Sequence, residues 1–216
     1  IQEWPVPDEW DIEGVFMEGP KIKKVGDYYY LTTAEGGTAG PATGHMIVQA
    51  RSKSVKGPWE FSPYNPILRA QSRNEKWICK GHGTLIDDVK GNWYIIYHAY
   101  ENGYMTFGRQ TLLEPQELTA DGWFKTPDGV RADLPLKKPA GEAVQSRASL
   151  SVDFRNGEMP HHFRGFGGYD VSRFTFGPDG LTIQGKGTQG SNSNPLVFIS
   201  GDKRYELTPC ITLHGD

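Results

Sequence analysis

Glu18 and His82 are the residues in this sequence whose types and positions are best suited to proton transfer. Glu18 stands before a Gly-Pro step and follows the apolar run 15–17, and His82 stands between two glycines. Partial removal from water raises the pKa of a carboxyl group and keeps it protonated near neutral pH, as a general acid requires. Spacing alone supports two other interpretations equally well, a solvated carboxylate at a strand end for Glu18 and a hydrogen-bonded core histidine for His82.

Arg109 and Trp77 are further candidates, each with an ordinary structural interpretation. Arg109 could pair with a surface acid, and Trp77 could either stack on a sugar or pack between elements of the fold. The remaining histidines outside strand-like runs have no partner pattern, and we interpret them as structural or solvent-exposed: His98, His161, His162 and His214.

An internal repeat indicates which elements position Glu18 and His82. Residues 18–32 and 82–97 both read as a strand, a tight turn containing glycine (Gly26-Asp27 and Gly91-Asn92) and an aromatic, β-branched strand. Glu18 and His82 are 64 positions apart, as are the equivalent aromatic residues and the tryptophans that close each segment, Trp59 and Trp123. Glu18 and His82 therefore begin equivalent strands of two equivalent units.

Each repeat holds further strand-like sequence before its closing tryptophan, at residues 45–51 and 104–111. Four short strands per repeat are typical of a β-propeller blade, whose innermost strand starts near the central channel. Two successive meanders of an ordinary β-sandwich are the alternative. Because two blades cannot close a ring, we expect further blades from elsewhere in a longer chain or from another copy.

The sequence after Trp123 predicts a linker and a second domain. Residues 126–149 are rich in proline, lysine, alanine and charge, whereas strand patterns resume at Leu150 with a strong turn at residues 178–180. The expected strands are 150–154, 173–176, 181–185, 196–199 and 205–213. We therefore expect an all-β chain with propeller blades over 1–125, a linker over 126–149 and the first part of a β-sandwich over 150–216.

Composition excludes several classes of function. The 216 residues carry a formal net charge of -3, which is not the basic footprint of a nucleic-acid-binding protein. No apolar run approaches the roughly 18 residues that span a membrane. The two cysteines, Cys79 and Cys210, fall in different expected domains, and we expect them to be unpaired. Zinc, phosphate-loop, dinucleotide and Ser-His-Asp motifs are absent from the sequence.

Several of these segments together resemble glycoside hydrolase family 43, over roughly residues 4–125. The resemblance rests on Met17-Glu18-Gly19-Pro20-Lys21, residues 26–31, Ala34-Glu35-Gly36-Gly37-Thr38, residues 50–54 with Gly57-Pro58-Trp59, Gly81-His82-Gly83 and Gly108-Arg109-Gln110-Thr111. The tail, with Asp153-Phe154 and residues 181–187, is similar to the concanavalin-like sandwich that follows the propeller in β-xylosidases of the family.

The resemblance implies a five-bladed propeller that hydrolyses xylosides or arabinofuranosides of hemicellulose with inversion. It places Glu18 on the general acid and Arg109 on an arginine that contacts the sugar. His82 falls on the axial histidine, which in several members helps to hold a calcium ion or an ordered water cluster. Thr38 lies in a loop near the pocket. No cofactor is required, and the implied partner is an oligosaccharide or polysaccharide, with no nucleic acid and no membrane.

One departure from the family pattern limits what these residues could do alone. The family's general base and second aspartate lie in its first blades and would precede Ile1, and we find no equivalent aspartate here. We therefore expect these 216 residues alone to be inactive. A non-catalytic carbohydrate-binding fragment is the alternative function. The family also implies a secreted or periplasmic protein.

Overall fold

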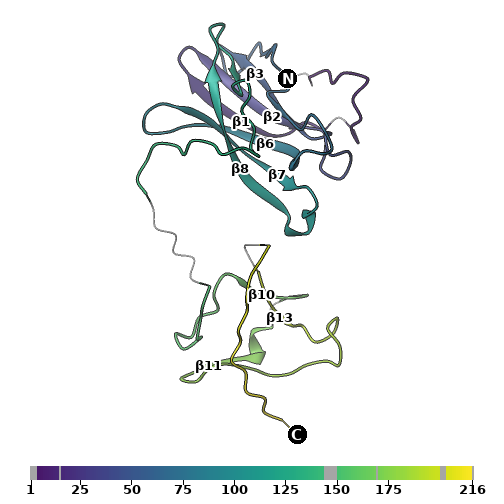
Figure 1. Cartoon of the computed structure of the whole chain (residues 1–216), viewed down its shortest axis with the longest axis vertical. Helices are drawn as coiled ribbons and strands as arrows, with labels where there is room; N and C mark the ends of the chain where they lie inside the picture. Colours follow the sequence, from purple (N-terminus) through teal and green to yellow (C-terminus); the bar gives the residue numbers. More distant parts are fainter. Residues whose placement is uncertain (1–3, 15, 144–149, 169, 200–202, 216) are drawn as a thin grey trace. The chain divides into compact units, whose positions relative to one another are not determined.

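The computed structural model consists of two compact units, which are described separately. Unit 1 is Ile1–Ala143 and unit 2 is Val144–Asp216. The structure describes residues 4–14, 16–143, 150–168, 170–199 and 203–215 (Figure 1). Its regular elements are almost entirely strands, with two short 3-10 helices, so the all-β class expected from the sequence is confirmed.

The first blade is an antiparallel sheet in which β1, β2, β3 and β4 follow one another, and β5 also pairs with β3. Its strands are β1 (Glu18–Val25), β2 (Tyr28–Glu35), β3 (Met46–Ser52), β4 (Glu60–Phe61) and β5 (Leu68–Arg69). Val25 pairs with Tyr28 across a two-residue turn, and Gly26 in that turn has φ 56°, which favours glycine. The predicted Gly-Asp turn is therefore confirmed.

The second blade repeats the order, with β6, β7, β8 and β9 in one antiparallel series. Its strands are β6 (Trp77–Asp87), β7 (Trp93–Glu101), β8 (Arg109–Leu118) and β9 (Phe124–Lys125). The predicted strand over 104–111 is wrong in its first half. Met105–Phe107 form the 3-10 helix η1, because the chain must reverse between β7 and β8, and β8 starts only at Arg109.

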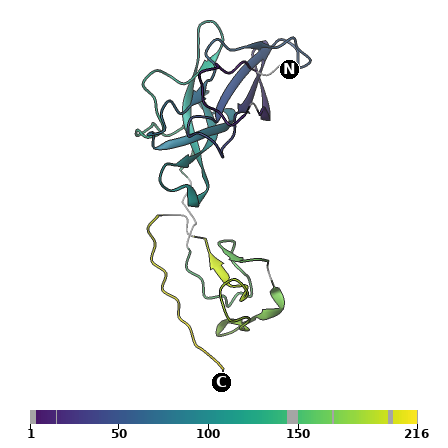
Figure 2. The same cartoon turned by 90° about the vertical axis from the view of Figure 1, so that its right-hand side faces the viewer.

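The 64-residue repeat is directly visible in the contacts between the two innermost strands, β1 and β6. Lys23 Nζ of β1 donates to Asp87 Oδ1 of β6 at 2.8 Å, and these residues are 64 positions apart. Glu18 and His82, also equivalent, approach each other nearer the start of the same strands. Equivalent positions of adjacent blades therefore lie side by side, and the blades pack together in both views (Figures 1 and 2).

A single hydrophobic cluster holds the two blades together. It contains Ile47 of β3 and Ile95 of β7, both fully buried, and Tyr30, whose ring meets that of Phe124 edge-on at 4.9 Å. Gly83 lies where an added Cβ would be 2.6 Å from both isoleucine Cδ1 atoms, so β6 can approach this cluster closely only with glycine there. The full list is Tyr30, Ile47, Ile67, Leu68, Leu85, Ile95, Tyr97, Ala99 and Phe124.

The chain beyond the second blade remains in unit 1 as far as Ala143. Ala132 packs against the hydrophobic cluster, and the backbone N–H of Ala140 donates to Asp88 Oδ2 at 2.8 Å. Asp88 also accepts hydrogen bonds from the backbone of Lys90 and Asn92, within the five-residue connection between β6 and β7. That connection is wider than the two-residue turn predicted there, and Asp88 stabilises it.

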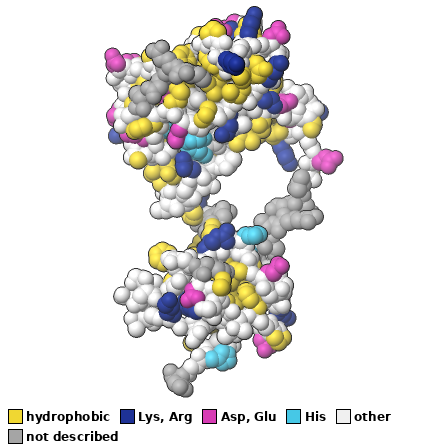
Figure 3. Space-filling model, turned by 180° about the vertical axis from the view of Figure 1, so that it is seen from behind, with side chains coloured by type: hydrophobic (Ala, Val, Ile, Leu, Met, Phe, Trp, Pro, Cys, Tyr) yellow, Lys and Arg dark blue, Asp and Glu magenta, His cyan; other side chains and the backbone are white. Residues whose placement is uncertain are grey.

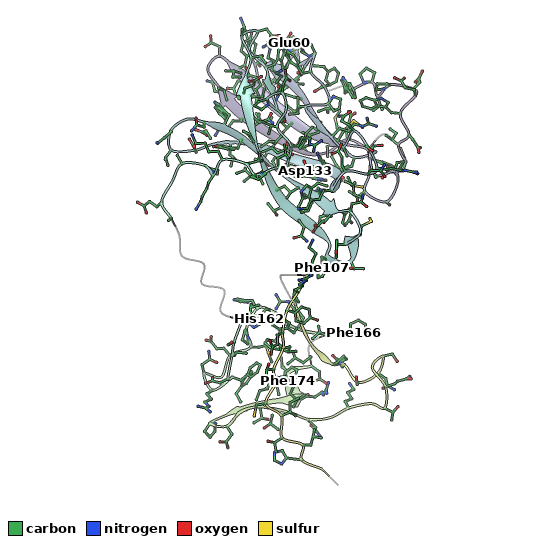
Figure 4. The ribbon with its side chains drawn as sticks, viewed as in Figure 1. Glu60, Phe107, Asp133, His162, Phe166 and Phe174 are labelled. Carbon is green, nitrogen blue, oxygen red and sulfur yellow. The ribbon has the colours of Figure 1, made fainter. Side chains whose placement is uncertain are left out.

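Unit 2 contains two small antiparallel pairs and the short helix η2. They are β10 (Phe163–Gly165) with β13 (Leu196–Phe198), η2 (Val171–Arg173), and β11 (Phe174–Gly177) with β12 (Gly180–Ile183). Figure 4 labels three residues of this unit, His162, Phe166 and Phe174. The predicted strands around 173–176, 181–185 and 196–199 are confirmed, with Pro178-Asp179 as the turn between β11 and β12.

Two predicted strands of unit 2 are wrong. Residues 150–154 are irregular, and Phe154 has φ 61°, outside the strand region. Residues 205–213 are extended but unpaired and exposed. Strand-like sequence becomes a strand only beside a hydrogen-bonding partner, and the described residues offer none to these two stretches.

Both cysteines are free, as expected, with Cys79 buried in unit 1 and Cys210 exposed in unit 2. In the described residues, no helix is both long and apolar enough to cross a bilayer.

Glu114, buried on β8, should make stability depend on pH. It accepts a hydrogen bond from the hydroxyl of Tyr97, and burial raises the pKa of its carboxyl above the ordinary 4.5. A pKa raised by folding adds stability that is fully present below the unfolded value and is lost as pH rises through the folded value. Glu114→Gln keeps an oxygen that accepts from Tyr97 and removes the ionisation.

We therefore expect the Tm of the Glu114→Gln variant to fall less than that of the wild type as pH rises from about 4.5 to neutrality. Calorimetry at a series of pH values measures this difference. The control is Glu117→Gln, an exposed carboxyl on the same strand. Parallel Tm curves for the Glu114 variant and the wild type would contradict the assignment.

Candidate active site

His82 lies in an irregular part of β6 that turns its side chain away from the regular strand positions. The register between β6 and β7 shifts twice, between Ile78 and Gly81 and between Gly81 and Thr84. Within this region Cys79 has φ 53° and His82 φ 56°, which non-glycine residues rarely adopt. β-Bulges and such strained residues are concentrated at functional sites, where they redirect a side chain.

Glu18, at the start of β1, meets His82 in the middle of β6, so the expectation that His82 begins its strand is wrong, because β6 already starts at Trp77. His82 Nε2 lies 3.6 Å from Glu18 Oε1, with side chains 30% and 55% exposed. The structure thus brings together the two residues that the repeat placed in equivalent positions. The sequence predicted that apolar neighbours partly shield Glu18 from water. The described residues do not provide this shielding, because the Glu18 side chain is half-exposed and Phe16 itself is 54% exposed.

His98 and Arg109 extend this pair into a chain of polar contacts. His98 Nε2 lies 2.9 Å from His82 Nδ1, and Arg109 Nη1 lies 3.2 Å from the same His98 nitrogen. Burial, followed by the charge of Arg109, lowers the pKa of His98 to about 4, so its ring is neutral at neutral pH. His98, which the sequence suggested was structural or solvent-exposed, instead connects two of the predicted site residues.

His45, at the start of the first blade's β3, forms the buried side of the site. It is fully buried, and its ring centroid lies 5.5 Å from that of His82 and 5.4 Å from that of His98. Its Nδ1–H donates to the carbonyl of Gly36 at 2.9 Å, so its Nε2 carries the lone pair. Burial lowers the pKa of His45, which keeps the ring neutral.

Two glycines make room for these rings. A Cβ on Gly81 would collide with the His45 ring, and a Cβ on Gly19 would collide with the His82 ring. Gly19 also has φ 62°, within the bulge that follows Glu18. Gly19 and Gly81, which flank Glu18 and His82 in the sequence, therefore leave the space into which the histidine rings fit.

Thr38 lies in the glycine-rich loop after β2, half-buried, with its carbonyl 4.0 Å from Cys79 Sγ. Glu13 fixes this loop. Its Oε1 accepts a hydrogen bond from the backbone N–H of Gly40 at 3.1 Å, and its carboxylate fills the space beside Gly37, Gly40 and Gly44. The loop is thus held next to the start of β6, the strand that carries His82.

Trp77, at the start of β6, packs against the hydrophobic cluster, with Lys76 Nζ 5.2 Å from its ring centroid. Its described contacts are with these neighbours and not with Glu18, His82 or Arg109. Of the five predicted site residues, the structure joins these three through His98, and it places Thr38 and Trp77 apart from that chain of contacts.

The described residues do not fit the calcium ion that the family resemblance suggested for His82. His45, His82 and His98 have ligand atoms within 4.8 Å of one another, but these are imidazole nitrogens. Calcium takes six to eight oxygen ligands. The half-exposed Glu18 carboxylate is the acidic group the structure places against His82. Seen from behind, histidine side chains appear at the surface of unit 1 (Figure 3).

Curated relatives match about half of this chain. The chain is 42% identical over 122 residues to "Non-reducing end alpha-L-arabinofuranosidase BoGH43B" from Bacteroides ovatus, covering 54% of this chain and 22% of the relative. It is 35% identical over 113 residues to "Xylan 1,3-beta-xylosidase" from a Vibrio species, covering 45% and 21%. The chain thus spans 22% and 21% of the length of these two relatives.

Solved structures match more of the chain. A Bacteroides ovatus structure titled "Xyloglucan PUL GH43B" has a TM-score of 0.70 and 29% identity, covering 85% of this chain and 37% of that one. BlXynB from Bacillus licheniformis, described as a GH43 protein, has a TM-score of 0.67 and 30% identity, covering 81% and 33%. The family model for "Glycosyl hydrolases family 43" matches residues 2–124, more than half of the sequence. The site at Glu18 and His82 lies within that match, and the chain belongs to glycosyl hydrolase family 43.

Proposed function

We propose that the protein containing this chain is a glycoside hydrolase that cleaves xylosidic or arabinofuranosidic bonds, with Glu18 as the general acid. The observation that carries the proposal is the contact between Glu18, at the start of β1, and His82, in β6 of the adjacent blade, with Oε1 and Nε2 3.6 Å apart. Membership of family 43 supports the reaction class.

The proposed mechanism is hydrolysis with inversion. The Glu18 carboxyl donates its proton to the glycosidic oxygen as the bond to the anomeric carbon breaks. A water molecule attacks that carbon from the opposite face of the sugar, and a second carboxylate accepts a proton from the water. In inverting enzymes the two carboxyl groups lie about 6.5–9.5 Å apart. We assign the second carboxylate to a residue outside this chain, so these 216 residues alone are inactive.

Arg109 is the residue that we expect to contact the sugar directly. It is exposed, and its Nη1 donates to His98, which leaves other guanidinium N–H groups for sugar hydroxyls. Thr38 and Trp77 are proposed as further substrate contacts. The glycine-rich loop held by Glu13 supports Thr38, whereas Trp77 would have to present to a sugar the part of its ring that does not pack against the core.

The proposed substrate is an oligosaccharide or polysaccharide of the hemicellulose type. The matched relatives are named as an arabinofuranosidase and a xylosidase, and both sugars are therefore candidates. A further relative, 33% identical over 92 residues, is named "Extracellular exo-alpha-(1->5)-L-arabinofuranosidase ArbA" from Cellvibrio japonicus. We accordingly propose that this protein is secreted or periplasmic.

The test is turnover of aryl xylosides and aryl arabinofuranosides by the full-length protein, with the anomeric configuration of the first product followed by NMR. We expect hydrolysis of at least one series and a product of inverted configuration. A product of retained configuration would contradict the mechanism. Sugar binding without turnover would contradict the reaction and support a carbohydrate-binding protein instead.

A further inference from the structure

A continuous chain of polar contacts runs from Arg109 to Glu18 through two imidazole rings. Arg109 Nη1 lies 3.2 Å from His98 Nε2, which lies 2.9 Å from His82 Nδ1. The other nitrogen of His82 lies 3.6 Å from Glu18 Oε1. The chain links β8, β7, β6 and β1, so both blades contribute to it.

The hydrogen-bonding capacities of these groups determine where the protons lie. A guanidinium group only donates, so His98 Nε2 must carry a lone pair. His82 Nδ1, 2.9 Å from the same nitrogen, then carries a hydrogen, and it shares the single lone pair of His98 Nε2 with Arg109. In its neutral form His82 therefore has its own lone pair on Nε2, the nitrogen that faces Glu18.

This tautomer determines which form of Glu18 its neighbour stabilises. A lone pair on His82 Nε2 accepts a hydrogen bond from a protonated carboxyl, whereas an N–H at that position would stabilise the carboxylate. A general acid must be protonated before the glycosidic bond breaks. The arrangement in which Nδ1 carries the hydrogen is thus the one that suits the acid.

The surroundings keep the two rings in place. His45 lies beside both rings and is itself fixed by its hydrogen bond to Gly36. Gly19 admits the His82 ring where a Cβ would collide with it. His98 Nδ1, which carries the hydrogen in this arrangement, is buried and has no hydrogen-bond partner among the described residues.

We propose that His98 is a positioning residue that fixes the tautomer and orientation of His82 and, through His82, holds Glu18 ready to donate its proton. The proposal rests on the proposed function, because it assigns His98 a role in delivering the proton of that acid. Arg109 has two roles in this scheme, since it contacts the sugar and also orients His98.

Kinetics of two variants of the full-length protein test the role of His98. His98→Leu removes the acceptor, and His98→Gln places an amide oxygen near the position of Nε2. For His98→Leu we expect a roughly 10- to 100-fold loss of kcat/KM on glycosides with poor leaving groups and a much smaller loss on dinitrophenyl glycosides. His98→Gln should recover most of the activity. Thr111→Val, at the residue paired with His98 on β8, is the control and should leave both activities unchanged.

Equal losses on the two substrate classes, or no recovery in His98→Gln, would overturn the proposal and indicate a merely structural residue. If His98→Leu does not fold, nitrogen-15 NMR of the wild-type imidazole rings decides the matter. Both His82 and His98 should carry their hydrogen on Nδ1, and hydrogen on Nε2 of either neutral ring overturns the proposal. If the wild type hydrolyses neither substrate class, the proposed function fails, and the role assigned to His98 fails with it even where the tautomers are as expected.

Discussion

Replacing Glu18 with glutamine in the full-length protein should reduce kcat/KM by about 10²- to 10⁴-fold on glycosides with poor leaving groups. Glutamine preserves the size of the side chain and its contact with His82 but cannot donate the acidic proton. A dinitrophenolate leaving group departs without protonation, so activity on dinitrophenyl glycosides should fall far less. Steady-state kinetics on the two substrate classes measure the difference.

Asp87→Asn is the matched control for this experiment. Asp87 pairs with Lys23 on the same two innermost strands, and the pair is exposed, so its loss should cost little stability. It lies near the other end of these strands, and we expect no change in activity on either substrate. A similar small loss on both substrates for Glu18→Gln would show that another group is the acid.

Much of unit 1 was predictable because its signals are local. A glycine turn between aromatic strands predicts a hairpin wherever it occurs, and two such hairpins 64 residues apart predict adjacent blades. The contact between Lys23 and Asp87 follows from the same repeat. The strands expected at 150–154 and 205–213 failed because pairing is not local, and an alternating pattern does not provide a partner strand.

The predictable part of the site was the part that the repeat encodes. Glu18 and His82 meet because equivalent positions of adjacent blades meet. His45 was missed because it precedes a different strand, β3, and reaches the site only through tertiary packing.

His98 could be found only with the register of the structure, because the two-residue turn predicted at Gly91-Asn92 would place His82 opposite Glu101. Thr84 pairs with Ile96, and the same register carried two residues farther places His82 opposite His98. In the structure the irregular part of β6 shifts the partner of His98 to Gly81, yet the two rings still meet. The bulge itself, with its positive φ at His82, could not be predicted from residue types.

Replacing Gly81 with alanine should damage both stability and activity. The added Cβ would collide with the His45 ring, and it would also lie 2.8 Å from His45 Cε1. That ring is fully buried and held by its hydrogen bond to Gly36. Gly36 itself cannot shift freely, because it packs against the backbone carbonyl of Gly44 with φ 69°. The strain must therefore pass to β6, which carries His82.

We expect Gly81→Ala to cost about 1–3 kcal/mol of stability, as overpacked cores do. A displacement of His82 by roughly 1 Å should lower kcat/KM by about 100-fold. Calorimetry and kinetics measure the two effects. Gly185→Ala is the control, because the space around Gly185 is open and its φ is ordinary, so its effect should stay within about 0.5 kcal/mol.

A double-mutant cycle with His45→Ala identifies the cause of the damage. His45→Ala alone leaves a cavity and should itself be destabilising. In the double variant the methyl group added at position 81 occupies part of that cavity. The loss of stability in the double variant should therefore be smaller than the sum of the losses in the two single variants. If the losses are simply additive, the methyl group disturbs β6 by a route other than His45, and the packing of His45 against Gly81 is not what holds His82 in position.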